Sequence, residues 1–296
     1  MQPIWIVIVN YHSQNLVCRC IESLQKHLVL PFKVVVVDNS AESETDKIEA
    51  GFPDTITIKA TSNDGFAAGC NIGVDHAIEH QADFILLLNT DTFTVQDFLS
   101  PMLEEFKNND KLGMAGPTIF YEEPANKIWM AGSTKNWWSG GAKHILDDSL
   151  ARDKKPVLVP FMSGCCMLLR VKAIKDVGLM DTRYFLYFED GDYCEAFLKN
   201  KWQIAYIPEA KLVHSASSTT GFQSENYVYY FSRNRIWLMY RWAPKIAFVY
   251  YFLFTLLVKV PGSIVVFSLF RRKPNLTKAF IKGFIDGVKN MGTKHE

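Results

Sequence analysis

The sequence lacks several features that assign other chains to specialised classes. Its six cysteines show no C-x-x-C spacing and lie in apolar or helix-like segments, so neither a disulfide framework nor a zinc site is predicted. The N-terminus has neither the basic region nor the small-residue cleavage site of a signal peptide. We therefore expect buried thiols in a reducing compartment, with the folded part of the chain in the cytoplasm.

A large net charge is also missing, since the 296 residues sum to +1. With 48% hydrophobic and 21% charged residues, neither wholesale disorder nor a polytopic membrane protein is indicated. The total hides an uneven distribution. From Arg241 onward ten Lys or Arg stand against two acidic residues, giving +8, whereas the preceding residues give −7. The C-terminal tail is therefore predicted to meet an anionic surface.

Short apolar runs alternate with helical periodicity in the first third of the chain. Ile4–Val9, Val34–Val37 and Phe84–Leu88 are unbroken runs of strand length. Apolar residues recur at helical spacing from Leu16 to Leu28, and another helix is expected to open near Ala67. This rhythm predicts an α/β fold with a doubly wound, mostly parallel sheet.

Polar residues follow each of these strands. They are Asn10 and Tyr11 after the first, Asp38 after the second, and Asn89 and Asp91 after the third. Such strand ends share one rim of a parallel sheet, where ligands bind, so a nucleotide site with a hard cation on its phosphates is predicted there. The same residue types also turn chains and cap helices, and the residues alone leave both interpretations open.

A glycine spacing lies between the second and third of these strand ends. Within Asn63-Asp-Gly-Phe-Ala-Ala-Gly-Cys-Asn71-Ile-Gly73, Gly65, Gly69 and Gly73 permit close backbone approach where a helix begins. The spacing is weak evidence for phosphate binding, because the Lys-Ser/Thr of a P-loop is missing.

Two later positions are candidates for chemistry. Glu189 and Asp190 follow the aromatic segment Tyr184-Phe-Leu-Tyr-Phe188 and open a predicted helix. Acidic residues cap helices well, yet aromatic shielding also raises a carboxyl pKa toward the range of a general base. His214, after an apolar pair, is either an ordinary hydrogen-bonded histidine or a metal ligand that the fold brings to Asp91.

Two further segments have less certain roles. Trp129–Gly141 contains Trp137-Trp138 and is expected to be either an acceptor-facing excursion or a patch of packed surface aromatics. Within Val157–Arg170 a strand is predicted over Phe161–Leu169, and its internal Gly164 allows another group to approach the backbone closely.

The order of these motifs resembles that of glycosyltransferase family 2, the inverting nucleotide-sugar glycosyltransferases with the GT-A fold, and especially a bacterial rhamnosyltransferase-like branch. The resemblance covers residues 4–242. Its motifs are Val9-Asn-Tyr11, Val37-Asp-Asn-Ser40, Asn63-x-Gly-Phe-Ala-x-Gly-x-Asn71, Asn89-Thr-Asp91, Phe188-Glu-Asp190-x-Asp192, His214 and Tyr229-Tyr-x-x-Arg233-Asn-Arg235. Each motif is weak alone, and their joint order carries the signal.

The resemblance implies a donor site for a dTDP- or UDP-sugar. Asp38 would contact the base, Asn63 and Asn71 would shape the nucleotide pocket, and Arg233 would help to neutralise the leaving diphosphate. The remaining implied donor-binding residues are Asn10, Tyr11, Gly65 and Asn89.

The resemblance also implies the catalytic residues. Asp91 would bind Mg²⁺ or Mn²⁺ on the diphosphate, with His214 as the second protein ligand. Asp190 would be the general base, with Glu189 beside it. The family's metal motif is commonly Asp-x-Asp, and here Asn89 replaces the first Asp, which puts its role as a ligand in doubt.

Residues 1–240 are expected to form the GT-A domain, and 241–296 a basic, apolar helical tail. Ile246–Val258 is a 13-residue apolar run, too short to span a bilayer, and a second run covers Ile264–Phe270. A pair of in-plane or re-entrant helices would keep the flanking basic clusters at the cytoplasmic face of a bacterial inner membrane, as in a peripheral or monotopic protein. The alternative is a helical pair packed on the globular domain or forming a homodimer interface.

The implied function is transfer of a sugar, with a deoxyhexose such as rhamnose favoured, to a lipid-linked or growing glycan acceptor in surface polysaccharide synthesis, without a nucleic-acid partner. A nucleotidyltransferase is one alternative, although Asn10-Tyr-His-Ser13 stands where its phosphate loop is expected. A catalytically inactive nucleotide-sugar-binding subunit is another, and the joint presence of Asp91, Asp190 and His214 argues against it.

Overall fold

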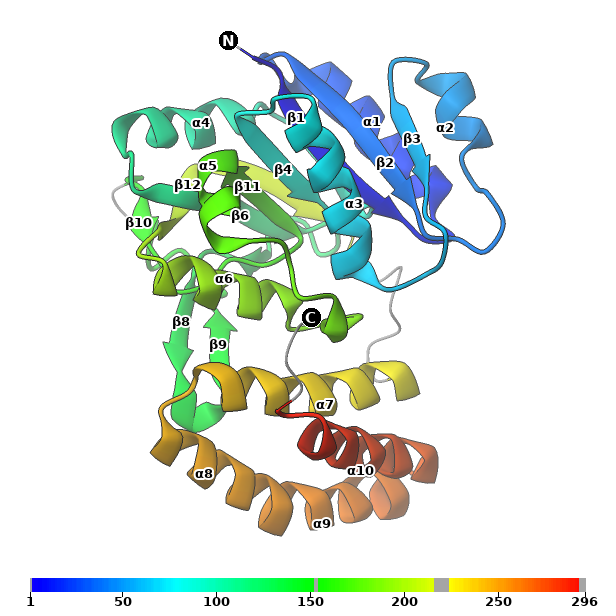
Figure 1. Cartoon of the computed structure of the whole chain (residues 1–296), viewed down its shortest axis with the longest axis vertical. Helices are drawn as coiled ribbons and strands as arrows, with labels where there is room; N and C mark the ends of the chain where they lie inside the picture. Colours follow the sequence, from blue (N-terminus) through cyan, green and yellow to red (C-terminus); the bar gives the residue numbers. More distant parts are fainter. Residues whose placement is uncertain (1, 152–153, 216–223, 293–296) are drawn as a thin grey trace. The chain divides into compact units, whose positions relative to one another are not determined.

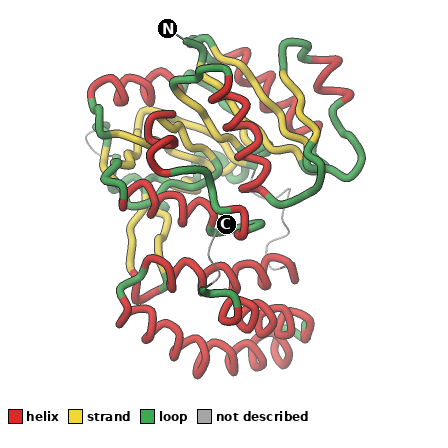
Figure 2. Tube along the Cα trace, in the orientation of Figure 1, coloured by secondary structure: helices red, strands yellow, loops and turns green. Residues whose placement is uncertain are grey.

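The computed structural model describes residues 2–151, 154–215 and 224–292. The chain folds as two compact units, which Figure 1 colours along the sequence and Figure 2 by secondary structure. The first comprises Met1–Thr134, His144–Phe185 and Glu189–Thr219, and the second Lys135–Lys143, Leu186–Phe188 and Thr220–Glu296. Two short segments from the middle of the chain thus belong to the same unit as the C-terminal helices.

One large sheet forms the centre of the first unit. Four parallel strands lie in the order β3 (Ile56–Lys59), β2 (Phe32–Asp38), β1 (Ile4–Asn10) and β4 (Phe84–Leu88). Beyond β4 follow the antiparallel β11 (Cys166–Arg170), then β6 (Leu112–Tyr121) and β12 (Gln203–His214), which run parallel to each other. β1, β2 and β4 are buried along most of their length, as parallel strands between two helical layers are. The predicted mostly parallel α/β fold is confirmed.

Helices cover both faces of this sheet (Figure 1). α1 (Gln14–His27) connects β1 to β2 on one face, and α3 (Phe66–Glu79) returns from the edge strand β3 to β4 across the other. α3 packs very closely on β1, since a Cβ at Gly69 would lie 2.7 Å from the Val9 side chain, and one at Gly73 would lie 2.3 Å from the Val7 side chain. These two glycines therefore serve helix–strand packing.

Shorter elements complete the first unit. They are α2 (Asp46–Gly51), β5 (Thr92–Phe93), α4 (Leu99–Asn108), β7 (Ile128–Met130), β10 (Val157–Leu158), α5 (Val171–Val177), η2 (Thr182–Tyr184) and α6 (Glu189–Lys199). The strand predicted over residues 161–169 is confirmed in its second half, where β11 (Cys166–Arg170) lies, and is wrong for residues 161–165, which belong to the loop between β10 and β11. The reason is that the Gly164 N–H donates to the Asp190 carboxylate, and not to a neighbouring strand.

The second unit is helical. α7 (Glu225–Trp242) packs against α10 (Pro274–Lys289), and between them in sequence run α8 (Lys245–Phe254), η3 (Thr255–Lys259), α9 (Val260–Ser263) and η4 (Ile264–Phe270). Its small core consists of Ile236, Met239, Tyr251 and Phe284. The tip η1 (Trp137–Ser139) of the hairpin β8 (Ser133–Asn136) and β9 (Gly141–His144) packs on α8. The second unit thus includes α7, most of which precedes residue 241, where the tail was expected to begin.

The segments from α8 to η4 form one continuous helix, so the expected pair of helices is wrong. Pro261 lies between the two apolar runs, and proline lacks the N–H of a regular helical bond. Here wider π-helical turns at η3 and η4 flank Pro261 and carry the helix through. Among the described residues this helix, Lys245–Phe270, is long and apolar enough to cross a membrane, and 11% of its most apolar window is buried.

Candidate active site

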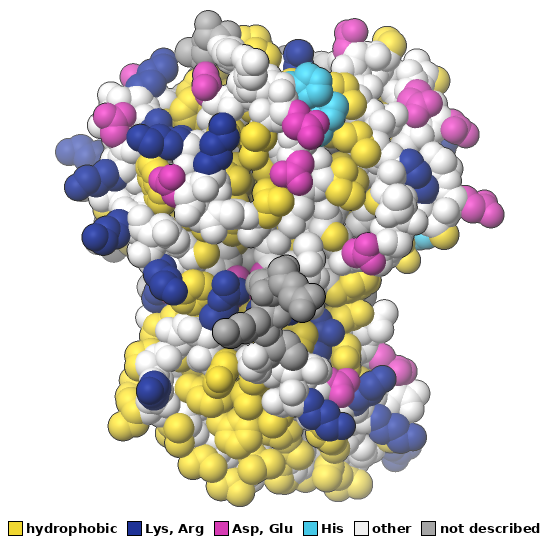
Figure 3. All heavy atoms as spheres, in the orientation of Figure 1, with side chains coloured by type: hydrophobic (Ala, Val, Ile, Leu, Met, Phe, Trp, Pro, Cys, Tyr) yellow, Lys and Arg dark blue, Asp and Glu magenta, His cyan; other side chains and the backbone are white. Residues whose placement is uncertain are grey.

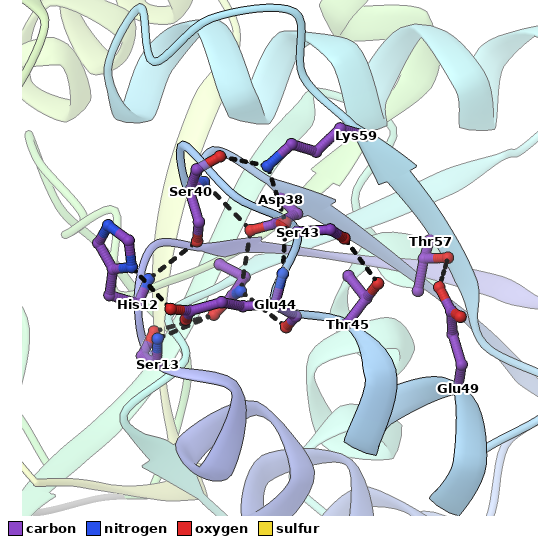
Figure 4. A network of polar contacts seen from close by, with 11 residues as sticks. His12, Ser13, Asp38, Ser40, Ser43, Glu44, Thr45, Glu49, Thr57 and Lys59 are labelled. Atoms are coloured by element: carbon purple, nitrogen blue, oxygen red, sulfur yellow. Dashed lines mark hydrogen bonds and ion pairs between the residues drawn. The ribbon is translucent and has the colours of Figure 1, made fainter.

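Asp38 is the centre of a polar network at the carboxyl end of β2 (Figure 4). Its side chain is fully buried. Oδ1 accepts hydrogen bonds from Asn10 Nδ2 at 3.0 Å and from the Ser40 N–H at 3.1 Å. Oδ2 accepts from the Glu44 N–H at 3.1 Å and from Lys59 Nζ at 3.1 Å. All four contacts lie on the rim where the sequence predicts nucleotide binding.

These contacts give Asp38 a structural task, and its contact with the base stays a prediction. Burial opposes its ionisation, but hydrogen bonds from Ser40, Glu44 and Lys59 outweigh burial and lower its pKa. Lys59 also donates to the Ser40 carbonyl and is 40% exposed. Sequence reasoning missed Lys59, whose signal was its place at the end of the neighbouring strand. Tyr11 is 50% exposed on the same rim, where a base could stack on its ring.

The predicted donor residues around α3 hold the loops of the site in place. Asn63 Oδ1 accepts from the Gly65 N–H at 3.2 Å, just before α3 begins. Asn71 bonds both backbone groups of Met180, donating to its carbonyl at 2.8 Å and accepting from its N–H at 3.0 Å. The Phe66 N–H donates to the Phe185 carbonyl at 2.7 Å. A Cβ at Gly65 would lie 2.1 Å from that carbonyl oxygen, so glycine is required there.

The fold brings Asp91 and His214 together, as the sequence predicts for two metal ligands. β5 pairs with the end of β12, with Thr92 opposite His214. His214 Nε2 consequently lies 3.1 Å from Asp91 Oδ1, and both side chains are buried. The Ser215 N–H donates to the Asp91 carbonyl at 2.8 Å, which fixes the backbone on either side of the pair. The backbone N–H of Asn89 donates to the Cys165 carbonyl at 3.0 Å.

The surroundings of His214 favour a tightly held imidazole. Trp129 packs edge-on against its ring at 4.8 Å, and the Cys165 side chain lies beside it. Burial opposes a charge on His214, yet Cys165 and Asp91 outweigh it and raise the pKa of His214 to about 10. His214 Nδ1 is buried without a hydrogen-bond partner among the described residues. Sequence reasoning missed Cys165, which reads as one more buried thiol.

The donor set fits a divalent cation held jointly with a substrate. One carboxylate and one imidazole suit Mn²⁺, and Mg²⁺ accepts carboxylate with phosphate oxygens. No group of three or more His, Cys, Asp or Glu in the described ranges could hold a metal ion. A cation at Asp91 and His214 would therefore need further oxygens, which a diphosphate supplies.

The acidic pair opens α6, as predicted. Asp190 Oδ2 accepts from the Gly164 N–H at 3.0 Å, and Oδ1 accepts from the Gly191 N–H at 2.7 Å. Glu189 is 6% exposed, and its Oε2 has no hydrogen-bond partner among the described residues. Burial raises the pKa of both carboxyls, and the Asp190 charge raises that of Glu189 further, well above its usual range. Asp190 is therefore the carboxyl that ionises first.

Two adjacent residues connect the base candidate with the metal-ligand candidates. Gly164 binds Asp190 through its N–H, and a Cβ at Gly164 would lie 3.4 Å from Asp190 Cβ. Cys165 lies beside His214 and accepts the Asn89 N–H. The close approach predicted at Gly164 is therefore that of Asp190.

Arg233 lies on α7, in the second unit. Its guanidinium packs over the rings of Tyr230 at 4.8 Å and Trp237 at 4.3 Å, and its Nε donates to Asn234 Oδ1 at 2.8 Å. Its contact with a leaving diphosphate stays a prediction.

Comparison with known proteins identifies the family. The profile described as Glycosyl transferase family 2 matches residues 5–178. The chain belongs to glycosyl transferase family 2. This glycosyltransferase is 23% identical over 240 residues to the N-acetylglucosaminyl-diphospho-decaprenol L-rhamnosyltransferase of Mycobacterium tuberculosis, covering 73% of this chain and 77% of that one. It is 25% identical over 302 residues to the low-salt glycan biosynthesis hexosyltransferase Agl10 of Haloferax volcanii, covering 98% and 92%.

A third relative is the dTDP-rhamnosyl transferase RfbF of Shigella flexneri, 25% identical over 214 residues and covering 72% and 69% of the two chains. The resemblance expected from the motifs is confirmed. Membership of this family also removes the nucleotidyltransferase alternative, because it makes the chain a glycosyltransferase and hence an enzyme.

Solved structures share the fold of the glycosyltransferase. The crystal structure of GalNAc-T7 with UDP, GalNAc and Mn²⁺ matches 98% of this chain and 57% of its own, with a TM-score of 0.66 and 13% identity. That of S. aureus TarS matches 98% and 50%, with a TM-score of 0.60 and 14% identity. The chain thus spans about half the length of these structures, whose likeness shows the fold alone.

Proposed function

We propose that this glycosyltransferase is an inverting, metal-dependent enzyme that moves a deoxyhexose such as rhamnose from a nucleoside-diphosphate sugar to a hydroxyl of a lipid-linked or growing glycan. The observation that carries the proposal is the pair of neighbours Gly164 and Cys165, one bound to Asp190 and the other beside His214. Inversion needs a base behind the attacking oxygen and positive charge at the leaving group. The loop that contains Gly164 and Cys165 contacts a candidate for the base, Asp190, and a candidate ligand for the cation that would supply the positive charge, His214.

Asp190 removes the proton of the acceptor hydroxyl as the hydroxyl oxygen forms a bond to the anomeric carbon of the donor sugar. The bond from that carbon to the diphosphate breaks on the opposite face, which inverts the configuration. Hydrogen bonds from the Gly164 and Gly191 N–H groups orient the carboxylate. Burial raises the pKa of Asp190, which makes it a stronger base than an exposed aspartate.

The leaving diphosphate requires charge neutralisation. Asp91 and His214 would hold the divalent cation, which when bound supplies Lewis-acid stabilisation of the departing oxygens. The solved structure of GalNAc-T7 with Mn²⁺ has the same fold, which supports Mn²⁺ or Mg²⁺ as the cation to test first. Asn10, Tyr11 and Asp38 would receive the nucleoside.

The names of the relatives guide the choice of donor and acceptor. Two of them are rhamnosyltransferases, one described as a dTDP-rhamnosyl transferase, which makes dTDP-rhamnose the first donor to test. The name of the Mycobacterium tuberculosis enzyme contains a diphospho-decaprenol lipid, which supports a lipid-linked acceptor for this chain in bacterial surface polysaccharide synthesis.

The helical unit supports an acceptor at a membrane surface. Figure 3 shows hydrophobic side chains gathered over the region of α8 and α9. Along the helix from α8 to η4 the exposed side chains include Ile246, Leu257 and Phe270, at 71%, 68% and 81%. Between Ile246 and Phe270 the sequence has one charged residue, Lys259, and its Nζ lies 4.4 Å from the centre of the Tyr251 ring in the core of the unit. The exposed side of the helix is thus uncharged.

Basic and aromatic residues at the ends of this helix fit the same surface. Arg241 and Lys245 precede it and Arg271–Lys273 follow it. Near its start, Trp138 and Tyr250 are 54% and 48% exposed, with ring centroids 5.5 Å apart. Such residues anchor proteins at anionic bilayer surfaces. We therefore place the enzyme at the cytoplasmic face of the inner membrane.

Release of nucleoside diphosphate tests the proposed reaction. The full-length protein is incubated with Mg²⁺ or Mn²⁺ and a panel of dTDP-, UDP- and GDP-sugars, with and without a polyprenyl-diphosphate sugar acceptor. We expect metal-dependent dTDP release from dTDP-rhamnose that increases with the acceptor. Binding of nucleotide sugars without release from any member of the panel would support the inactive binding subunit instead.

A further inference from the structure

The turn that leads into the catalytic pair has an unusual backbone. Phe185, Tyr187 and Phe188 have positive φ angles of 28°, 69° and 72°. Bulky L-residues rarely adopt this left-handed region, because the side chain crowds the backbone. Glu189 and Asp190 follow Phe188 directly, so the strained turn sets the position from which α6 begins. Such a conformation persists only where its surroundings impose it.

Hydrogen bonds from Asn234 on α7 impose this conformation. Its side chain is fully buried, and Nδ2 donates to the Leu186 carbonyl at 2.8 Å and to the Tyr187 carbonyl at 2.7 Å. Arg233 Nε donates to Asn234 Oδ1 at 2.8 Å, which fixes the orientation of the amide. Both hydrogen atoms of the amide therefore point to consecutive carbonyls of the turn.

Ring contacts from the same helix add to these bonds. The Tyr187 ring lies 5.2 Å from that of Tyr227, and the Phe188 ring lies 4.8 Å from that of Phe231. The Arg235 guanidinium lies 5.2 Å from the centre of the Phe188 ring. The four α7 positions 227, 231, 234 and 235 are spaced i, i+4, i+7 and i+8. They therefore share one face of α7, and this face contacts the turn.

We infer that Asn234 is a positioning residue for the catalytic pair. It holds the turn in which Tyr187 and Phe188 have a backbone conformation that their own side chains disfavour, and the peptide bond from Phe188 to Glu189 passes this constraint to the first turn of α6. The helical unit therefore takes part in the reaction, in addition to any membrane contact. The inference rests on the proposed function in one respect, that Asp190 is the base.

The test compares Asn234→Asp with Thr277→Val in the full-length protein. Asn234→Asp retains an acceptor for Arg233 and loses the two N–H donors. Thr277→Val is the matched control, because Thr277 is also buried in the helical unit, where its hydroxyl donates to the Ser263 carbonyl at 3.0 Å. Both variants lose buried hydrogen bonds, and only the first loses them at the turn. Asn234→Ser, which retains a single donor, is the second variant if Asn234→Asp does not fold.

Two measurements are made on each protein. Amide hydrogen exchange, read by mass spectrometry over residues 184–192, reports whether the turn is held. Hydrolysis of dTDP-rhamnose with water as acceptor still needs a base, and its kcat and KM separate positioning from donor binding. We expect Asn234→Asp to exchange about 10-fold faster over this stretch and to lower kcat about 10- to 100-fold, with the donor KM within about twofold of wild type. Thr277→Val should change neither.

Unchanged exchange over residues 184–192 in a folded variant overturns the inference, as does a raised KM at constant kcat. Loss of folding in both Asn234 variants also overturns it, since Asn234 would then support the whole unit. Failure of the proposed function has a different signature: the wild type then releases dTDP from dTDP-rhamnose at no measurable rate, while the exchange measurement still decides whether Asn234 holds the turn.

Discussion

Glu189 and Asp190 are neighbours on one helical turn, but their surroundings give them different tasks. Asp190 has backbone donors at both carboxylate oxygens, whereas Glu189 Oε2 is buried without one in the described part of the chain. The negative charge of Asp190 further opposes ionisation of Glu189. Glu189 therefore holds its proton more tightly than Asp190 does, and Asp190 is the member of the pair that accepts a proton from the substrate.

Asp190→Asn tests the assignment of Asp190 as the general base. The amide keeps the shape of the side chain but cannot accept a proton, so kcat should fall by roughly 10²- to 10⁴-fold. Affinity for dTDP, measured by calorimetry, should stay near wild type. Glu195→Gln, a charge change on the same helix, is the control and should retain activity. Weaker dTDP binding at unchanged kcat would place Asp190 in the donor pocket.

Glu189→Gln should make stability less dependent on pH. Because burial raises the pKa of Glu189 in the folded state, the folded protein binds this proton more tightly than the unfolded chain does. The stability that this provides is complete below the unfolded pKa and is lost as pH rises through the folded pKa, by up to about 1.4 kcal/mol per pH unit. Urea unfolding from pH 5 to 9 should therefore show the variant gaining on wild type as pH increases. Parallel curves would show that Glu189 titrates normally.

Asp91→Asn should remove the dependence of donor binding on metal. The carboxylate is the anionic member of the predicted ligand pair, so Mn²⁺ should no longer tighten dTDP binding, and turnover should be nearly abolished. Calorimetric titration of dTDP with and without Mn²⁺ measures this, with the exposed Glu104→Gln on α4 as control. Equal metal enhancement in Asp91→Asn and wild type would remove Asp91 from the metal site.

At the scale of elements, the strands and most of the first helices follow from apolar periodicity, because parallel strands buried on both faces leave a clear signal in sequence. What the sequence did not reveal are contacts between distant elements. Cys165 reads as a buried thiol until the loop before β11 places it beside His214. Lys59 reads as the polar end of an edge strand until β3 places it against Asp38. The expected pair of helices was wrong, because π-helical turns on either side of Pro261 let one helix continue through it.

The exposed side of the long helix should bind membranes. Leu257→Glu places a charge on this side, where Leu257 is 68% exposed, so the fold should tolerate it while vesicle binding weakens about 10- to 100-fold. Sedimentation with vesicles that contain phosphatidylglycerol measures the effect. Leu146→Glu, at a position 64% exposed in the first unit, is the matched control and should bind as wild type. Salt should release the wild type only in part, since apolar burial is not screened. Equal binding of both variants would contradict the membrane assignment.

For the whole molecule, the order of weak motifs predicted the family, because chemistry at strand ends requires particular residues in a fixed sequence order. It did not predict how the chain divides. The expected domain boundary near residue 240 stays a prediction. In the structure, the second compact unit contains α7 and residues 186–188 together with the tail. The sequence could not reveal this division, because the contacts of Asn234 with residues 186–188 join positions nearly fifty residues apart.

We propose that Asp190 is the general base in inverting sugar transfer from a nucleoside-diphosphate donor. The most direct measurement follows dTDP-rhamnose and a polyprenyl-diphosphate sugar with Mn²⁺, using wild type and Asp190→Asn at equal dTDP occupancy, and determines the anomeric configuration of the product by NMR. We expect wild type to release dTDP together with a product of inverted configuration, and the variant to do so at least about 10²-fold more slowly. A product of retained configuration, or equal rates for the two proteins, would contradict this proposal.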